Sequence, residues 1–208
     1  DRSPSRGADE RVNEHWPHDV VTVTGPDALT YLHSQLSQDL RNLAVGSGVW
    51  SLLLQPTGRV DALVWVQRTG DDSFELSVDR GCGDAVVARL NRFRIRVKAD
   101  VALTGTLEGD PDKYLQYRVR SAWPAVGAEI TEATIPGEMP RVVQEAVSFS
   151  KGCYPGQELV ERMDSRGASA PRLLSRVRVA DHPDVVFATV AGEWGLAYIG
   201  RAARSAAD

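Results

Sequence analysis

Short apolar runs separated by glycine and proline dominate the first hundred residues of the chain. Five stretches have the alternating or continuously apolar character of strands: residues 20–25, 49–55, 59–67, 74–78 and 94–103. Leucines spaced three and four residues apart predict an amphipathic helix over 26–40, and residues 84–93 predict a second helix. The resulting order, βαβββαβ over 19–103, indicates a mixed sheet with helices packed on it.

The pattern weakens after residue 103. Residues 104–113 are polar and turn-rich, residues 114–120 alternate as in a strand, and the next twenty residues contain the prolines and glycines of a long loop. A short element of uncertain type is expected at 141–149, and a helix at 158–164. Three β-like runs between 172 and 200 suggest a small C-terminal barrel or sandwich.

Composition restricts the class of protein. The chain has 208 residues, of which 42% are hydrophobic and 25% charged, and these are ordinary values for a globular α+β protein. A formal net charge of -4 argues against a general nucleic-acid binder, which needs a basic surface, so no direct nucleic-acid binding is expected. There is no apolar run of membrane-spanning length, and residues 1–14 lack the apolar stretch of a secretory signal. With only two cysteines, these features predict a cytoplasmic protein.

The stretch KGCYPGQELVER at 151–162 is the most unusual part of the chain. Two glycines and a proline in six residues predict a tight loop that a ligand can approach closely. Lys151 stands two residues before Cys153, and a nearby cation increases the thiolate fraction of a cysteine. The alternative is that Cys153 is a small buried residue and that the charged side chains form a solvated ion-pair network.

Other kinds of site find less support in the sequence. The four histidines are scattered without metal-ligand spacing, and Cys82 is far from Cys153, so no metal site is expected. There is no phosphate-binding loop motif and no nucleophile elbow. Trp50 and Trp65 are interpreted as core residues or as the wall of a ligand site, and Trp123 as the anchor of its loop.

The segment KGCYPGQE resembles the K-G-C-Y-x-G-Q-E signature of the YgfZ family of folate-binding proteins, which is related to the aminomethyltransferase of the glycine cleavage system. Further similarity lies in VTVTGPDALTYLHSQLSQDL, LLLQPTGRVDALVWV, WPAVGAEIT and GEWGLAYIGR. The resemblance covers about 19–201 and is weakest in the middle. It implies an aminomethyltransferase-like folate-binding fold, in which mixed sheets form a ring around a central channel and a small β-barrel follows. Four parts are expected: 19–103, a reduced or partly missing 104–150, the signature loop at 151–171, and 172–201.

The resemblance also implies a function. Tetrahydrofolate or a derivative is the expected cofactor, and iron–sulfur enzymes or assembly factors are the expected partners, with an effect on tRNA modification through them. Cys153 is the candidate for catalysis. The candidate folate ligands, which offer aromatic, polar or charged groups to the pterin and to the anionic tail, are Arg59, Asp61, Lys151, Tyr154, Gln157, Glu158 and Arg162.

Two alternatives remain open. The first is an aminomethyltransferase that acts on a lipoyl carrier protein, and the second is a non-catalytic binding scaffold. Aminomethyltransferases carry an acidic pair after the hairpin glycine, whereas Gly58-Arg59-Val60-Asp61-Ala62 contains one acid, which counts against the first alternative. If the protein is an enzyme, transfer of a one-carbon or aminomethyl group that depends on folate is expected.

Overall fold

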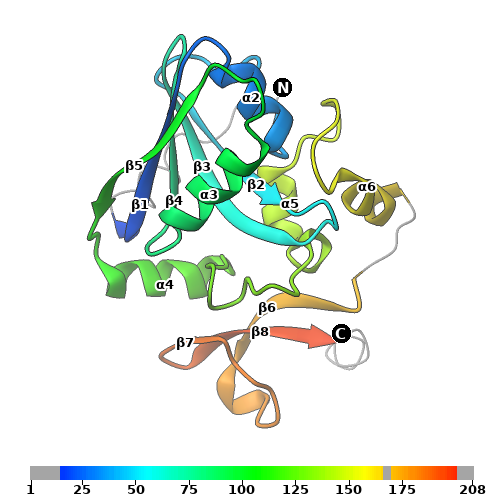
Figure 1. Ribbon diagram of the computed structural model, residues 1–208. Helices are drawn as coiled ribbons and strands as arrows, with labels where there is room; N and C mark the ends of the chain where they lie inside the picture. Colours follow the sequence, from blue (N-terminus) through cyan, green and yellow to red (C-terminus); the bar gives the residue numbers. More distant parts are fainter. Residues whose placement is uncertain (1–14, 166–169, 201–208) are drawn as a thin grey trace.

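The computed structural model describes residues 15–165 and 170–200 and shows an α+β protein built on a five-stranded sheet (Figure 1). The predictions made for residues 1–14 and for the end of the C-terminal part at 201 lie outside these residues. The strands of this sheet are β1 (His18–Thr24), β2 (Gly48–Leu54), β3 (Val60–Gly70), β4 (Ser73–Asp79) and β5 (Asp100–Leu107). Their order is β2-β3-β4-β1-β5, and all of their pairings are antiparallel, which corrects the expectation of a mixed sheet.

Helices and a second sheet complete the described part of the chain. The helices are α2 (Ala28–Gln35), α3 (Gly83–Phe93), α4 (Pro111–Ser121), α5 (Pro140–Ala146) and α6 (Gln157–Ser165), with short 3-10 turns at Pro136–Glu138 and Val179–Asp181. The second sheet has the order β6-β8-β7, formed by β6 (Arg172–Arg178), β7 (Thr189–Ala191) and β8 (Trp194–Gly200). In Figure 1, α4 lies between the two sheets.

The β2–β3 part of the large sheet is buried on both faces, which fits the continuous apolar runs of these two strands, whereas β5 at the opposite edge is mostly exposed. One face packs against α2 and α3 through residues such as Ala62, Val64 and Phe74. The other face packs through Leu52 and Trp65 against a cluster to which α4, α5 and the small sheet contribute. Trp50 and Trp123 join this second cluster with their ring centroids 4.9 Å apart, so the predicted tryptophans belong to the core.

Both sheets of the described residues are open rather than closed on themselves. The three C-terminal β-like runs do form strands, but β6 and β7 both pair only with β8 and leave two free edges. The expectation of α+β structure is confirmed, and the expected ring of sheets and C-terminal barrel are not observed in this arrangement.

Three expected elements have different bounds or a different type in the structure. The leucine pattern of 26–40 is buried as predicted, but the helix ends at Gln35 and Leu36 adopts extended backbone. The run at 94–103 is a strand only from Asp100, because Arg96 takes a left-handed backbone conformation that breaks the alternation. Residues 114–120 are helical rather than extended.

The prediction of a strand in place of α4 was wrong because the residues that cap and start this helix lie before the alternating run. Asp110 caps the helix by accepting a hydrogen bond from the backbone N–H of Lys113 at 3.1 Å, and Pro111 occupies the first helical position. Tyr114 and Arg118 are four residues apart and both buried, which is the helical period. The seven residues 114–120 fit both the strand period of two and the helical period of 3.6, so the helix cap before them determines that they are helical.

The residue that ends α4 supports a stability prediction. Ala122 has a φ of 51° and a ψ of 42°, a left-handed conformation that glycine adopts at lower cost. Ala122→Gly is therefore expected to raise the free energy of unfolding by about 0.5–1 kcal/mol, measured by urea denaturation. Gly46→Ala is the matched reverse change, because Gly46 has a φ of +83° in open space. It is expected to lower the free energy of unfolding by about 1 kcal/mol; equal signs for the two variants would contradict this account.

Candidate functional site

Within the segment 151–171, α6 begins at Gln157, so the name signature loop is kept for residues 151–158, whose start is anchored by the side chain of Lys151. The Nζ atom donates to the carbonyl oxygens of His33 at 2.5 Å and of Leu36, next to the end of α2, and it lies 3.4 Å from the carbonyl oxygen of Gln38. A cation at the last carbonyls of a helix stabilises them. Burial lowers the pKa of Lys151 to about 8. The geometry therefore gives this lysine a structural role in the loop.

The second anchor of the loop is Tyr154. Its ring is buried in the core below the large sheet, with the Lys151 ammonium 5.0 Å from the ring centroid. Its backbone N–H donates to Gln157 Oε1 at 2.9 Å, and Gln157 Nε2 donates to Glu161 at 2.8 Å. Burial raises the pKa of Tyr154 to about 12, so the phenol is neutral at physiological pH.

Cys153 lies between these two anchors and is exposed as a free thiol. The alternative interpretation, in which Cys153 is a small buried residue, disagrees with this exposed position. The other cysteine, Cys82, is half-buried at the start of α3, and burial raises its pKa to about 11. Of the two thiols, only Cys153 is presented on the surface.

The signature loop packs directly on the turn of the β2–β3 hairpin. Gly156 has a φ of +80°, and a Cβ atom there would lie 2.5 Å from the carbonyl oxygen of Gln55 and 2.9 Å from the Cα of Gly58. Gly58 has a φ of +85°, and a Cβ there would lie 2.6 Å from the Cβ of Leu159. Each glycine therefore leaves room for the other segment, and the two predicted motifs form one packed unit.

A cavity of about 340 Å³ opens beside the same hairpin turn, between the start of β3 and the segment 126–132. Its lining residues are Gln55, Val60, Asp61, Val126, Gly127, Ile130, Thr131 and Glu132. Three aliphatic side chains form apolar walls, and two carboxylates, one amide and one hydroxyl supply polar groups. A small number of polar groups in an apolar cavity of this size is typical of a small-molecule site.

Asp61 is the sequence-predicted residue that this cavity contains. Its Oδ2 atom accepts from Arg89 Nε at 3.0 Å, and Arg89 also donates to the carbonyl oxygen of Leu54 at 2.8 Å. The Oδ1 atom of Asp61 has no hydrogen-bond partner in the described part of the chain, and the side chain is 24% exposed. The carboxylate is oriented by the arginine and keeps one oxygen available to a ligand.

The remaining predicted residues lie outside this cavity. Arg59 is exposed at the hairpin turn, Glu158 and Arg162 form an exposed pair at 2.6 Å on α6, and Lys151, Tyr154 and Gln157 are engaged within the loop. The structure brings the signature loop to the hairpin that carries Asp61. It does not bring the loop's side chains into the cavity, and their roles toward folate stay predictions.

Four polar or charged residues at the site were not predicted from the sequence: Gln55, Arg89, Thr131 and Glu132. Gln55 and Glu132 lie in or beside turns, and Arg89 lies in a helix distant in sequence from Asp61. The only available signal was the family-like segment WPAVGAEIT, which runs into the cavity wall. No group of three histidine, cysteine or acidic residues within 15–165 and 170–200 has the geometry to hold a metal ion.

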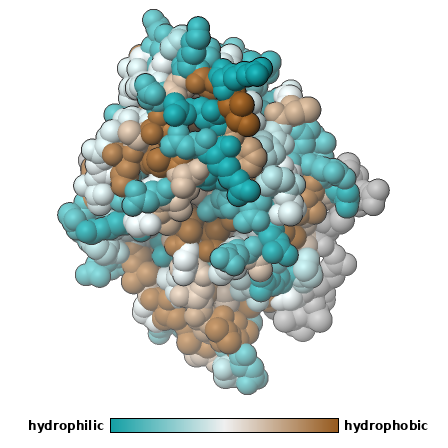
Figure 2. Space-filling model, in the orientation of Figure 1, coloured by the Kyte–Doolittle hydropathy of each residue, from teal (hydrophilic) through white to brown (hydrophobic). Residues whose placement is uncertain are grey.

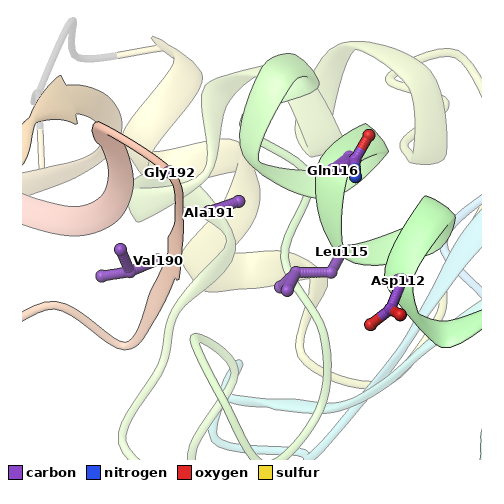
Figure 3. A pocket seen from close by; sticks show the side chains of 6 residues that line it. All are labelled: Asp112, Leu115, Gln116, Val190, Ala191 and Gly192. Carbon is purple, nitrogen blue, oxygen red and sulfur yellow. The ribbon is translucent and has the colours of Figure 1, made fainter.

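Two further cavities occur in the described structure. One of about 450 Å³ shares Thr131 with the first cavity and includes Arg172, whose guanidinium Nε donates to Glu138 at 2.7 Å. The other, of about 550 Å³, lies between α4 and β7 (Figure 3). Leu115 and Ala191 point toward one another there, and the lining contains no cation.

Sequence comparisons relate the chain to iron-sulfur cluster assembly factor, YgfZ and aminomethyltransferase sequences, although no family model matches it. It is 25% identical to the mitochondrial iron-sulfur cluster assembly factor IBA57 homolog of Pyricularia oryzae, over 78% of this chain and 56% of the relative. It is 32% identical to the tRNA-modifying protein YgfZ of Sodalis glossinidius, over 39% of this chain and 26% of the relative. The chain thus spans about half of the first relative and about a quarter of the second.

A solved structure agrees in fold. The glycine cleavage system aminomethyltransferase T of Bartonella henselae superimposes with a TM-score of 0.72 at 14% identity, over 93% of this chain and 81% of that chain. At this identity the match shows a shared fold. No helix in the described part of the chain is both long and apolar enough to cross a membrane.

Proposed function

We propose that this chain, whose relatives and fold support membership of the YgfZ and aminomethyltransferase-like family, is a tetrahydrofolate-binding factor that assists the assembly or repair of iron–sulfur proteins. Through such proteins it would affect tRNA modification. The observation that carries the folate half is the cavity beside the hairpin, in which the oriented carboxylate of Asp61 keeps a free oxygen.

The cavity suits the pterin end of a folate. A pterin is flat and presents ring N–H and amino groups along one edge, which a carboxylate accepts with charge-assisted hydrogen bonds. Val60, Val126 and Ile130 supply the apolar walls, and Asp61 supplies the acceptor. Arg172, in the neighbouring cavity, is paired with Glu138 at 2.7 Å and would exchange this partner for the anionic glutamate tail when folate binds.

The thiol and the proposed folate site are separate in this arrangement. Cys153 is exposed on the loop that packs against the outside of the hairpin turn, and it does not line the cavity. A substitution in the cavity is therefore expected to weaken folate binding without affecting the thiol, and a substitution of Cys153 is expected to leave folate binding intact. Tetrahydrofolate, when bound, would supply one-carbon or acceptor chemistry, and the chain's own residues would orient it and exclude water.

Isothermal titration calorimetry with tetrahydrofolate tests the proposal. Asp61→Asn is expected to weaken binding by about 10–100-fold, because a hydrogen bond to a charged group contributes about 1.5–3 kcal/mol. Glu193→Gln is the matched control, since Glu193 is an exposed carboxylate paired with Arg178 at 3.0 Å. No binding by the unaltered protein would reject the folate function, and full affinity in Asp61→Asn would reject this cavity.

Cys153→Ala separates the two halves of the proposal. It is expected to bind tetrahydrofolate normally and to fail to restore the activity of a [4Fe–4S] enzyme in cells that lack the native protein. Release of ammonia from an aminomethyl-lipoyl donor would instead favour the aminomethyltransferase alternative.

A further inference from the structure

The last turn of α3 and the connection from α3 to β5 contain a concentration of exposed cations. Arg92, Arg96 and Lys98 are exposed, and no carboxylate in the described part of the chain lies within ion-pair distance of them. We call residues 92–98 the basic loop. The chain as a whole carries a net charge of -4, so this positive surface is a local feature.

The basic loop also exposes a large apolar side chain. Ile95 is 77% exposed, whereas Val97 packs partly against the core beside α2 and α3. In a regular strand these two residues would share one face. Arg96, with a φ of 60°, breaks that alternation and leaves Ile95 in solvent among the cations. Unfavourable backbone together with an exposed isoleucine indicates a functional constraint.

The base of the basic loop is held firmly. The Lys98 backbone N–H donates to Asp27 Oδ2 at 2.7 Å, and the Asp27 backbone N–H donates to the Lys98 carbonyl oxygen at 3.2 Å. The Arg94 guanidinium donates to the carbonyl oxygen of Ala99 and lies 3.3 Å from Asp100. A surface that is already ordered loses less conformational entropy on binding.

We propose that Ile95, Arg92, Arg96 and Lys98 form a docking surface for a partner protein that has an acidic rim around an apolar pocket. In protein interfaces an apolar anchor fills a pocket, while arginine is enriched around it and charged groups steer the encounter. Figure 2 shows hydrophilic residues with hydrophobic ones between them at the top of the molecule, where α3 leads into β5 in Figure 1.

Protein is favoured over RNA as the partner by the environment of the aromatic residue in this loop. RNA-binding proteins stack bases on exposed aromatic rings. The guanidinium of Arg89 lies 4.0 Å from the centroid of the Phe93 ring and that of Arg92 lies 5.8 Å from it, so this ring is already stacked by arginine. Phe93 is 37% exposed and Ile95 is 77% exposed, so the most exposed apolar group of the basic loop is aliphatic and suits a protein pocket.

This inference goes beyond the proposed folate function, because the basic loop contains neither the cavity lining nor the signature loop. Site-specific photo-crosslinking tests it in cells that naturally make the protein. Benzoylphenylalanine is placed at Ile95, and at Val186 as a matched control, since Val186 is 90% exposed and lies near Asp184. A specific protein adduct is expected at position 95 and not at 186.

The captured protein is then produced in pure form and titrated with the unaltered chain and its variants. Arg96→Glu and Ile95→Ala are each expected to weaken binding at least about tenfold, and added salt is expected to weaken it further. Arg96→Gly provides a second readout, because it relieves the left-handed backbone while removing a cation. It is expected to raise the melting temperature and still lower the affinity.

Three results would overturn the proposal. They are an adduct with RNA, adducts that are absent at 95 or equal at 95 and 186, and an affinity for the captured protein that Arg96→Glu and Ile95→Ala leave unchanged. Tetrahydrofolate binding by the same variants is expected to be normal, so failure of this proposal and failure of the folate proposal are distinguishable.

Discussion

Gly156→Ala is expected to lower the free energy of unfolding by about 3 kcal/mol and to detach the signature loop from the β2–β3 hairpin. Two costs add. A left-handed conformation costs a residue with a Cβ about 1–2 kcal/mol, and overpacking costs a further 1–3 kcal/mol. The added Cβ would meet backbone atoms of Gln55 and Gly58, which cannot rotate away as a flexible side chain would.

Chemical denaturation measures the loss for Gly156→Ala, and hydrogen exchange of the amides at 55–58 reports the detachment. Gly152→Ala is the matched control in the same loop, because no atom lies within 4 Å of the Cβ it would gain and its φ lies outside the left-handed region. That variant is expected to change the free energy of unfolding by less than about 0.5 kcal/mol. Similar losses for the two glycines would refute the packed contact as the cause.

Arg118→Met is expected to cost about 3–5 kcal/mol, because it leaves the carboxylate of Glu129 buried without its cation. The Glu129 side chain is fully buried and pairs with Arg118, while its Oε1 atom has no partner among the described residues. Arg118 Nη2 also contacts Thr189 at 3.2 Å, so the pair ties α4 to the small sheet.

A double-mutant cycle checks the origin of this loss. Arg118→Met combined with Glu129→Leu is expected to recover most of the stability, because apolar residues of similar size can replace a buried ion pair. Arg178→Met, which removes one member of an exposed ion pair, is the control and is expected to cost less than about 1 kcal/mol. No recovery in the double variant would contradict burial of the lone carboxylate as the cause.

Elements with a strong local signal were predictable from the sequence. The strands β2 and β3 were recognised because a proline–glycine turn separates two apolar runs, and α3 because its apolar residues follow the helical period. The secondary structure of residues 94–121 was not predictable in this way. It depends on the left-handed backbone of Arg96 and on the helix cap formed by Asp110. Neither feature can be recognised from the periodicity of hydrophobic residues.

The candidate site was predictable only in part, and for a related reason. The signature and the hairpin glycine identified two segments that matter, and Asp61 identified one polar group of the cavity. Arg89 and Glu132 escaped notice because each reaches the site through the packing of segments far apart in the chain, and Gln55 because nothing in its hairpin turn marks it as a ligand. The same packing turned Lys151 and Tyr154 toward the interior and left Cys153 outside.

The sequence by itself determined the α+β class, the strands with clear turns, the lack of an apolar run of membrane-spanning length and the family-like signature, because each of these depends on local residue types and spacing. Only the tertiary structure decided which signature side chains are anchors, which carboxylate opens into a cavity, and where the unpaired cations gather. The reason is physical: the direction of a side chain depends on which distant backbone packs against its own, as Gly156 and Gly58 show where the signature loop meets the hairpin.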